Sequence, residues 1–213
     1  MNIDMETYLF DFDGTLVDSM PSYISVMLRI LDEENIKYGN DIIKTITPLG
    51  FKGTAEYYQN LGVSLSTEEL GRKMGSYAIY EYTYNIPAKQ NVETALKELK
   101  KRGASLNVLT ASPHITLDPC LKRLGLFGLF DNVWSCDDFN TTKADPEIYR
   151  SAAEKLGKCV GDIIFLDDNY NALMTAKSAG MRVYGVYDAS SEEYTDDIKA
   201  ISERYISDFS ELL

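Results

Sequence analysis

Short apolar segments alternate along most of this chain with segments whose apolar residues recur every three or four positions. The segments 8–10, 106–109, 163–166 and 182–186 are mostly apolar and have the length of buried strands. The first three run directly into polar residues, which are Asp11, Thr110, and Asp167 with Asp168. The pattern therefore predicts strands that each deliver polar side chains at their carboxyl end.

Helical patterns follow these predicted strands. Apolar residues lie on one helical face over 92–99 and again over 172–176. An aspartate followed by proline is typical of a helix N-cap and first turn, so helices are predicted to begin at Asp118 and Asp145. Alternating apolar strands and helices predict a mostly parallel sheet that is covered by helices on both faces.

The segment 18–85 has a different pattern. A helix is predicted from about residue 20, and two further helices are predicted later in the segment, one of them opened by a capping box at Ser66. No strand is predicted there. We therefore expect an α/β fold with two parts: a Rossmann-like, doubly wound parallel-sheet core formed by 1–17 and 86–213, and an inserted α-helical cap domain formed by 18–85.

Composition narrows the classes of partner. The 213 residues are 45% hydrophobic, which is enough for one core domain and a smaller inserted one. Together, 21 basic and 33 acidic residues give a net charge of -12, which repels nucleic-acid backbones and anionic bilayers. No apolar run approaches the roughly 20 residues that span a membrane. We expect neither a nucleic acid nor a membrane as partner.

Cysteine and histidine are too sparse to indicate a zinc site or a disulfide framework. The three cysteines are far apart in the sequence and the chain has one histidine. That histidine, His114, has no nucleophile motif beside it, so a catalytic triad is not indicated. The N-terminal residues carry no basic stretch followed by an apolar one, so we expect no secretory signal and a cytoplasmic protein.

The loop after the first predicted strand carries two carboxylates, Asp11 and Asp13, followed by Gly14. Glycine permits a sharp turn that aims backbone N–H groups at an anion. A carboxylate such as Asp11 can attack phosphorus, and Asp13 can protonate the leaving oxygen and later activate water. Residues that follow separate parallel strands converge at one edge of the sheet, so we expect Thr110 and Asp168 to lie close to Asp11. This pattern predicts chemistry on a phosphate ester.

These motifs resemble those of the haloacid dehalogenase superfamily. Residues 11–15, Asp-Phe-Asp-Gly-Thr, reproduce the Asp-x-Asp-Gly-Thr loop of its phosphatase branch. Thr110, Lys143, and the pair Asp167 and Asp168 match the three other motifs in the same order. The resemblance spans essentially the whole chain. It implies a Mg²⁺-dependent phosphatase that hydrolyses a small phosphate monoester through an aspartyl phosphate.

The same resemblance assigns roles to individual residues. Asp11 is implied to be the nucleophile and Asp13 the acid/base. The implied Mg²⁺ ligands are Asp11, the backbone carbonyl of Asp13, Asp167 and Asp168, and which of the last two binds directly stays open. The residues implied to bind the substrate are Phe12, Asp13, Thr110, Ala111 and Lys143, and Lys52 is implied to contact the leaving group from a loop between cap helices. We expect a monomer that acts on a small phosphorylated metabolite.

Two other functions have to be compared with this one. A phosphosugar mutase resembling β-phosphoglucomutase shares all four motifs, so the motifs leave hydrolase and mutase both open. A phosphoacceptor signalling module resembling response-regulator receivers also uses a phosphorylated aspartate. Receivers place the acidic pair before the acceptor, whereas here Asp11 comes first and Asp168 last, and this order argues against a receiver. The identity of the phosphate ester is not fixed by the sequence.

Overall fold

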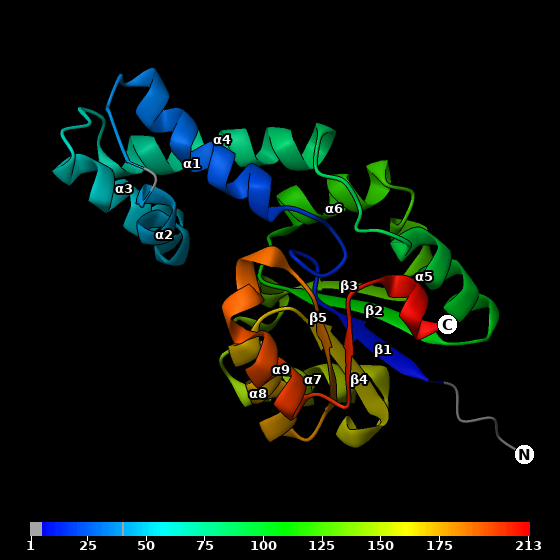
Figure 1. The fold of residues 1–213 in the computed structure, drawn as a ribbon. Helices are drawn as coiled ribbons and strands as arrows, with labels where there is room; N and C mark the ends of the chain where they lie inside the picture. The colour runs from blue at the N-terminus through cyan, green and yellow to red at the C-terminus, as the bar shows by residue number, and fades with distance from the viewer. Residues whose placement is uncertain (1–5, 40) are drawn as a thin grey trace, which may run out of the picture. The chain divides into compact units, whose positions relative to one another are not determined.

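A single parallel sheet organises the larger part of the molecule (Figure 1). The computed structural model describes residues 6–39 and 41–213, so the first five residues of the predicted core lie outside the description. The strands are β1 (Thr7–Phe10), β2 (Ser105–Thr110), β3 (Asn132–Ser135), β4 (Ile163–Asp167), β5 (Arg182–Val186) and β6 (Arg204–Ile206). Their order is β3-β2-β1-β4-β5-β6, and every neighbouring pair is parallel. The predicted parallel α/β core is confirmed.

The strand order reverses between β1 and β4, which lie side by side at the middle of the sheet. The chain winds outward from β1 through β2 to β3, and then returns to β4 and winds through β5 to β6. In open sheets of this kind, ligands bind beyond the carboxyl ends of the strands at such a reversal. The topology therefore directs attention to the residues that end β1 and β4.

Helices cover both faces of this sheet. The α-helices of the sheet-containing unit are α5 (Val92–Lys101), α6 (His114–Arg123), α7 (Pro146–Leu156), α8 (Tyr170–Ala179) and α9 (Thr195–Ile201). Its 3-10 helices are η2 (Phe127–Leu129), η3 (Cys136–Phe139), η4 (Val160–Asp162), η5 (Ala189–Tyr194) and η6 (Phe209–Leu212). In Figure 1, α7, α8 and α9 lie together on one side of the sheet and α5 lies on the other.

Alternate side chains of the central strands pack into the core on opposite faces of the sheet. Leu9 and Phe165 pack with Tyr149 of α7 in one buried cluster. Phe10, the neighbour of Leu9, faces the opposite side, where its ring lies 6.2 Å from that of Phe209 in η6. Because successive side chains of a strand point to opposite faces, a strand that is covered on both sides has to be apolar throughout. This explains the apolar runs at β1 and β4 in the sequence.

The chain divides into two compact units, of which the second is Ser19–Ile86. The first takes in the described residues up to Asp18 together with Pro87–Leu213. The second contains α1 (Met20–Glu33), α2 (Ile42–Ile46), η1 (Thr47–Leu49), α3 (Gly50–Asn60) and α4 (Thr67–Tyr84), and it has a buried cluster of its own. None of the described helices is both long enough and apolar enough to cross a membrane.

Two details of the second unit differ from expectation. Three α-helices follow α1 among the described residues where two were predicted, since α2 is a five-residue helix too short to give a periodic pattern. Lys52 was expected in a loop between helices, but it lies in the first turn of α3. The capping box at Ser66 is present, and both of its hydrogen bonds with Glu69 are formed at the start of α4.

The prediction of a helix start at Asp118 was wrong, because α6 begins at His114. Pro113 is the extended residue that precedes the helix, and its carbonyl oxygen accepts the first hydrogen bonds. The Asp118 carboxylate pairs with the imidazole of His114 instead of capping a backbone N–H. Pro119 therefore lies inside the helix, where it supplies no N–H donor to the preceding turn.

Candidate active site

The loop after β1 is built around Gly14. The Asp11 N–H still donates to the Leu166 carbonyl oxygen at 2.8 Å, so the sheet fixes the point from which the Asp11 side chain departs. Gly14 has φ +74, and its N–H donates to the Val17 carbonyl oxygen at 3.0 Å, which closes the turn. A Cβ on Gly14 would lie 2.7 Å from the carboxylate of Asp168. Glycine is thus required both by the backbone conformation and by the approach of that carboxylate.

Three buried carboxylates meet at the strand-order reversal. Asp11 follows β1, Asp167 is the last residue of β4, and Asp168 comes next. Their residues are 6%, 0% and 8% exposed, and one oxygen from each lies within 4.8 Å of the others. Buried like charges at this separation repel one another strongly unless a cation lies among them. Hard carboxylate oxygens are also what Mg²⁺ prefers, so these three residues could hold a metal ion.

Lys143 supplies one positive charge to this cluster. Its Nζ donates to Asp11 and also to Asp167 Oδ2, the second at 2.9 Å. The lysine lies just before α7, whose first turn is fixed by the N-cap Asp145 as predicted. Its backbone carbonyl also accepts a hydrogen bond from the buried Tyr149 hydroxyl at 3.2 Å. Local structure on both sides of Lys143 therefore holds its ammonium group against the nucleophile candidate.

The electrostatics of the cluster show a shortage of positive charge. Burial raises the pKa of Asp11 to about 6, because the lowering effect of Lys143 is opposed by the nearby Asp167 carboxylate. Burial, together with Asp167 and Asp11, raises the pKa of Asp168 well above its ordinary value. Burial alone would lower the pKa of Lys143, but Asp11 and Asp167 raise it overall. One lysine does not balance three carboxylates, and a bound divalent cation would.

Hydroxyl groups that the sequence motifs did not assign bind Asp168 of this cluster and the nearby Asp13. Asp168 accepts from Thr15 Oγ1 at 3.2 Å and from Ser191 Oγ at 3.1 Å, one bond on each oxygen. Asp13 accepts a short hydrogen bond from Ser112 Oγ. Thr15 and Ser112 both lie inside recognised motifs and could have been considered for that reason. Ser191 lies in η5, which follows β5, and the sequence carries no comparable signal there.

The remaining predicted residues are placed as follows. Thr110 ends β2 next to β1, is buried, and accepts from the Ser112 N–H at 3.1 Å. Ala111 is exposed at the start of the following loop, and the ring of Phe12 is buried in the core. Lys52 is exposed on α3 of the second unit, so its contact with a leaving group stays a prediction.

Sequence comparison gives a family match over most of the chain. The model of the family described as "Haloacid dehalogenase-like hydrolase" matches residues 8–186. This range begins with β1 and ends with β5, so it contains every motif that was singled out in the sequence.

Individual relatives agree with this match. The chain is 32% identical over 181 residues to pyrophosphatase PpaX of Bacillus velezensis, which covers 84% of this chain and 81% of that protein. It is 27% identical to a phosphoglycolate phosphatase of Colwellia psychrerythraea, over 99% of this chain and 96% of that one. A crystal structure described as a predicted phosphoglycolate phosphatase from Haemophilus somnus superposes with a TM-score of 0.83 at 23% identity, covering 100% and 98% of the two chains. The last comparison supports the fold alone.

Proposed function

This chain belongs to the haloacid dehalogenase-like hydrolase family, and on that premise we propose that it is a Mg²⁺-dependent phosphatase of small phosphate monoesters that uses Asp11 as its nucleophile. Curated relatives named as a pyrophosphatase and a phosphoglycolate phosphatase support a phosphatase or phosphotransferase activity. They also support a small phosphorylated molecule as the substrate.

The observation that carries the proposal is the position of Asp11. Its carboxylate is buried between Lys143 and two further carboxylates at the strand-order reversal, the place where this fold class binds ligands. A carboxylate that is buried with a net excess of negative charge is costly to maintain for structural reasons alone. Such a group is more readily explained by a requirement for chemistry at this point.

The first chemical step forms a bond between an Asp11 carboxylate oxygen and phosphorus. The bond between phosphorus and the leaving oxygen breaks, and Asp13 donates a proton to that oxygen. Lys143 stays paired with Asp11 and supplies positive charge beside the phosphoryl group that Asp11 attacks. The Ser112 hydroxyl holds the Asp13 carboxylate by hydrogen bonding to one of its oxygens.

The second step returns the enzyme to its starting state. Asp13 accepts a proton from a water molecule, the water oxygen bonds to phosphorus, and the bond from phosphorus to Asp11 breaks. Inorganic phosphate and the free Asp11 carboxylate are the products. Asp11, Asp167, Asp168 and the Asp13 carbonyl would hold Mg²⁺, which when bound would offset the charge of the carboxylates and of the phosphoryl oxygens.

The proposal is tested by a screen of small phosphate monoesters with Mg²⁺, with EDTA, and with the Asp11→Asn variant. We expect phosphate release that needs Mg²⁺, and a loss of turnover in Asp11→Asn of roughly a thousandfold or more, since the amide cannot act as the nucleophile. Beryllium fluoride, a mimic of the bound phosphoryl group, should form its adduct on Asp11. Unchanged turnover in the variant would exclude Asp11 as the nucleophile.

The mutase alternative is separated by the fate of the phosphoryl group. A hydrolase releases inorganic phosphate in an amount equal to the substrate consumed. A mutase converts a phosphosugar into its isomer and releases no phosphate. Measuring both products in one reaction therefore distinguishes the two activities, which share the same nucleophile.

A further inference from the structure

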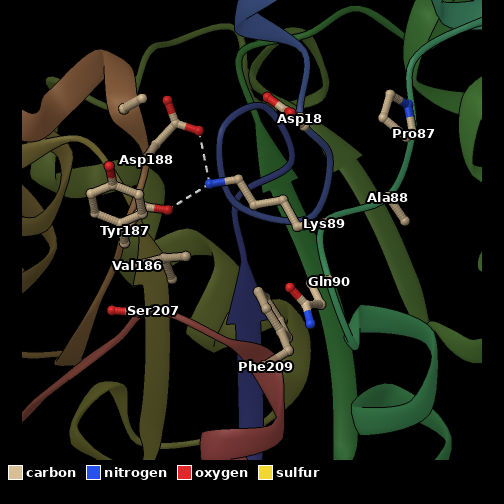
Figure 2. Close-up of a pocket in the computed structure, with 11 residues that line it drawn as sticks. Asp18, Pro87, Ala88, Lys89, Gln90, Val186, Tyr187, Asp188, Ser207 and Phe209 are labelled. Carbon is tan, nitrogen blue, oxygen red and sulfur yellow. Dashed lines mark hydrogen bonds and ion pairs between the residues drawn. The ribbon is translucent and has the colours of Figure 1, made fainter.

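A largely buried ion pair lies in the first unit, outside the residues given a chemical role above. Lys89 Nζ lies 2.8 Å from Asp188 Oδ2 and donates to the Tyr187 carbonyl oxygen at 2.6 Å (Figure 2). The two side chains are only 16% and 5% exposed. The pair joins the segment that precedes α5 to the loop that follows β5, and it lines a pocket of about 280 Å³.

The second oxygen of the Asp188 carboxylate organises the loop. Asp188 is the N-cap of η5, and its Oδ1 accepts from the Ser190 N–H at 2.9 Å and from the Ser190 hydroxyl at 2.6 Å. The Asp188 carbonyl accepts from the Ser191 N–H at 3.1 Å. Asp188 thus divides its two carboxylate oxygens between Lys89 and the first turn of η5, and this arrangement fixes where Ser191 lies.

Ser191 links η5 to the carboxylate cluster. Its hydroxyl donates to Asp168 Oδ2 at 3.1 Å, while Thr15 donates to the other oxygen of Asp168. A carboxylate oxygen accepts more than one bond, so each oxygen of Asp168 can accept a hydroxyl hydrogen and still face a cation. A carboxylate held on both oxygens has its plane fixed before the cation arrives.

We propose that Lys89, Asp188 and Ser191 are positioning residues that hold Asp168 in the orientation in which it binds a divalent cation. The inference rests on the cation site of the proposed function and extends it to residues that do not touch the cation. Groups that orient a metal ligand typically change metal affinity by about tenfold to a hundredfold when they are removed. Lys89 is already engaged by Asp188 and Tyr187, so the pocket beside it offers no free ammonium group to an anionic ligand.

The test measures binding of Mn²⁺ to the full chain by electron paramagnetic resonance, in which free Mn²⁺ gives the signal. Ser191→Ala is expected to weaken Mn²⁺ binding by about tenfold. Ser191→Thr keeps the hydroxyl and is expected to bind within about twofold of the unchanged protein. Ser178→Ala is the matched control, because Ser178 is exposed on α8 and its hydroxyl donates to the Thr175 carbonyl oxygen.

A second variant tests the ion pair between Lys89 and Asp188. Lys89→Met is expected to weaken Mn²⁺ binding by several-fold to tenfold, because Asp188 loses its ion pair and η5 loses its anchor. Lys177→Met is its control, since Lys177 also donates to a backbone carbonyl, that of Ile201. Thermal unfolding without the metal ion shows whether each variant is folded, and affinities are compared among folded variants only.

Asp168→Asn separates failure of this inference from failure of the proposed function. If Asp168→Asn abolishes Mn²⁺ binding while Ser191→Ala and Lys89→Met bind as tightly as the unchanged protein, the positioning role is wrong and the cation site stands. If Asp168→Asn binds Mn²⁺ normally, both are wrong. Weaker binding in Ser191→Ala and Lys89→Met, with recovery in Ser191→Thr, supports the inference, since a purely structural role would not follow the hydroxyl group.

Discussion

Gly14 shows how a single residue can satisfy two independent constraints. Its φ of +74 costs a residue with a side chain about 1–2 kcal/mol. A Cβ would also lie 2.7 Å from Asp168, so that carboxylate would have to move away from the cluster. We expect Gly14→Ala to reduce the free energy of unfolding by roughly 1–3 kcal/mol and to weaken Mg²⁺ binding. Urea denaturation and calorimetric Mg²⁺ titration measure the two effects.

The matched control is Gly71→Ala. Gly71 lies inside α4, and nothing lies within 4 Å of the position that its Cβ would take. Alanine at an open helical position should stabilise the protein by about 0.5–1 kcal/mol. The two alanine substitutions are therefore expected to have opposite signs. A Gly14→Ala protein as stable as the original would show that the turn tolerates a side chain.

A residue of the site could be predicted from the sequence only when the residues next to it in the chain formed a recognisable pattern. Asp11, Gly14 and Asp168 were singled out because each lies directly after an apolar strand or within a short motif. Ser191 and Lys89 carry no such signal. Their roles come from hydrogen bonds to residues distant in the sequence, and these bonds exist only once β5 and its following loop are in place.

At the scale of an element, His114 connects the start of α6 to η3. Its Nδ1 lies 2.8 Å from Asp118 and its Nε2 lies 2.9 Å from Asp138, which also accepts the Ser135 N–H at the N-cap of η3. The hydrogen bonds to Asp118 and then Asp138 raise the pKa of His114 above its usual value near 6.5. A charged imidazole that donates to two carboxylates stabilises both element starts.

The sign of the resulting pH dependence follows from the raised pKa. Stabilisation by His114 is fully present below the unfolded-state pKa of about 6.5, and is lost as the pH rises through the higher folded-state pKa. We expect His114→Gln to remove this part of the pH dependence, so that the two proteins differ more in stability below about pH 6 than above about pH 8. The free energy of unfolding by urea at several pH values measures it, and an equal difference at every pH would contradict the argument.

The Asp-Pro signature predicted one helix start correctly and another wrongly. Asp145 caps α7, and Gly157 ends that helix in the left-handed conformation, as their positions in the sequence suggest. Asp118 has the same Asp-Pro signature but pairs with His114. Strands β3 and β6 went unpredicted because they lie at the sheet edges, where a long apolar run is not required.

At the scale of the whole molecule, the fold class follows from the alternation of elements, but the strand order does not. The reversal between β1 and β4 depends on which strands pair, and pairing joins residues more than 150 positions apart, such as Thr7 and Ile163. The site inherits this dependence, because Asp11 and Asp167 meet only when β1 and β4 are neighbours. The rule that residues after separate parallel strands converge at one edge of the sheet predicted the meeting of these residues, but not which strands are neighbours.

The raised pKa values of Asp11 and Asp168 connect the proposed cation binding to the stability of the whole folded chain. Burial raises the pKa of Asp11 to about 6 and also raises the pKa of Asp168, so both keep their proton to a higher pH than an ordinary carboxyl group does when no cation is bound. The contribution of Asp11 to stability is therefore present below the ordinary carboxyl pKa of about 4 and is lost as the pH rises through about 6, and that of Asp168 is lost as the pH rises through its own raised pKa. In the absence of Mg²⁺, the protein should lose stability over this interval.

Under the proposed function Mg²⁺ should reverse that loss, because it would compete with protons for oxygens that come together only in the folded chain. At a concentration about 100 times its dissociation constant, it adds about 2.7 kcal/mol to the free energy of unfolding. We expect the rise in melting temperature on adding Mg²⁺ to be large near about pH 7.5 and small near about pH 5, where protons occupy the site. Calorimetric scans with Mg²⁺ and with EDTA measure it, and Asp168→Asn should remove the rise at both pH values. A rise of the same size at both pH values would mean that Mg²⁺ binds elsewhere than at the buried carboxylates, since only groups that titrate in this interval can make its binding depend on pH.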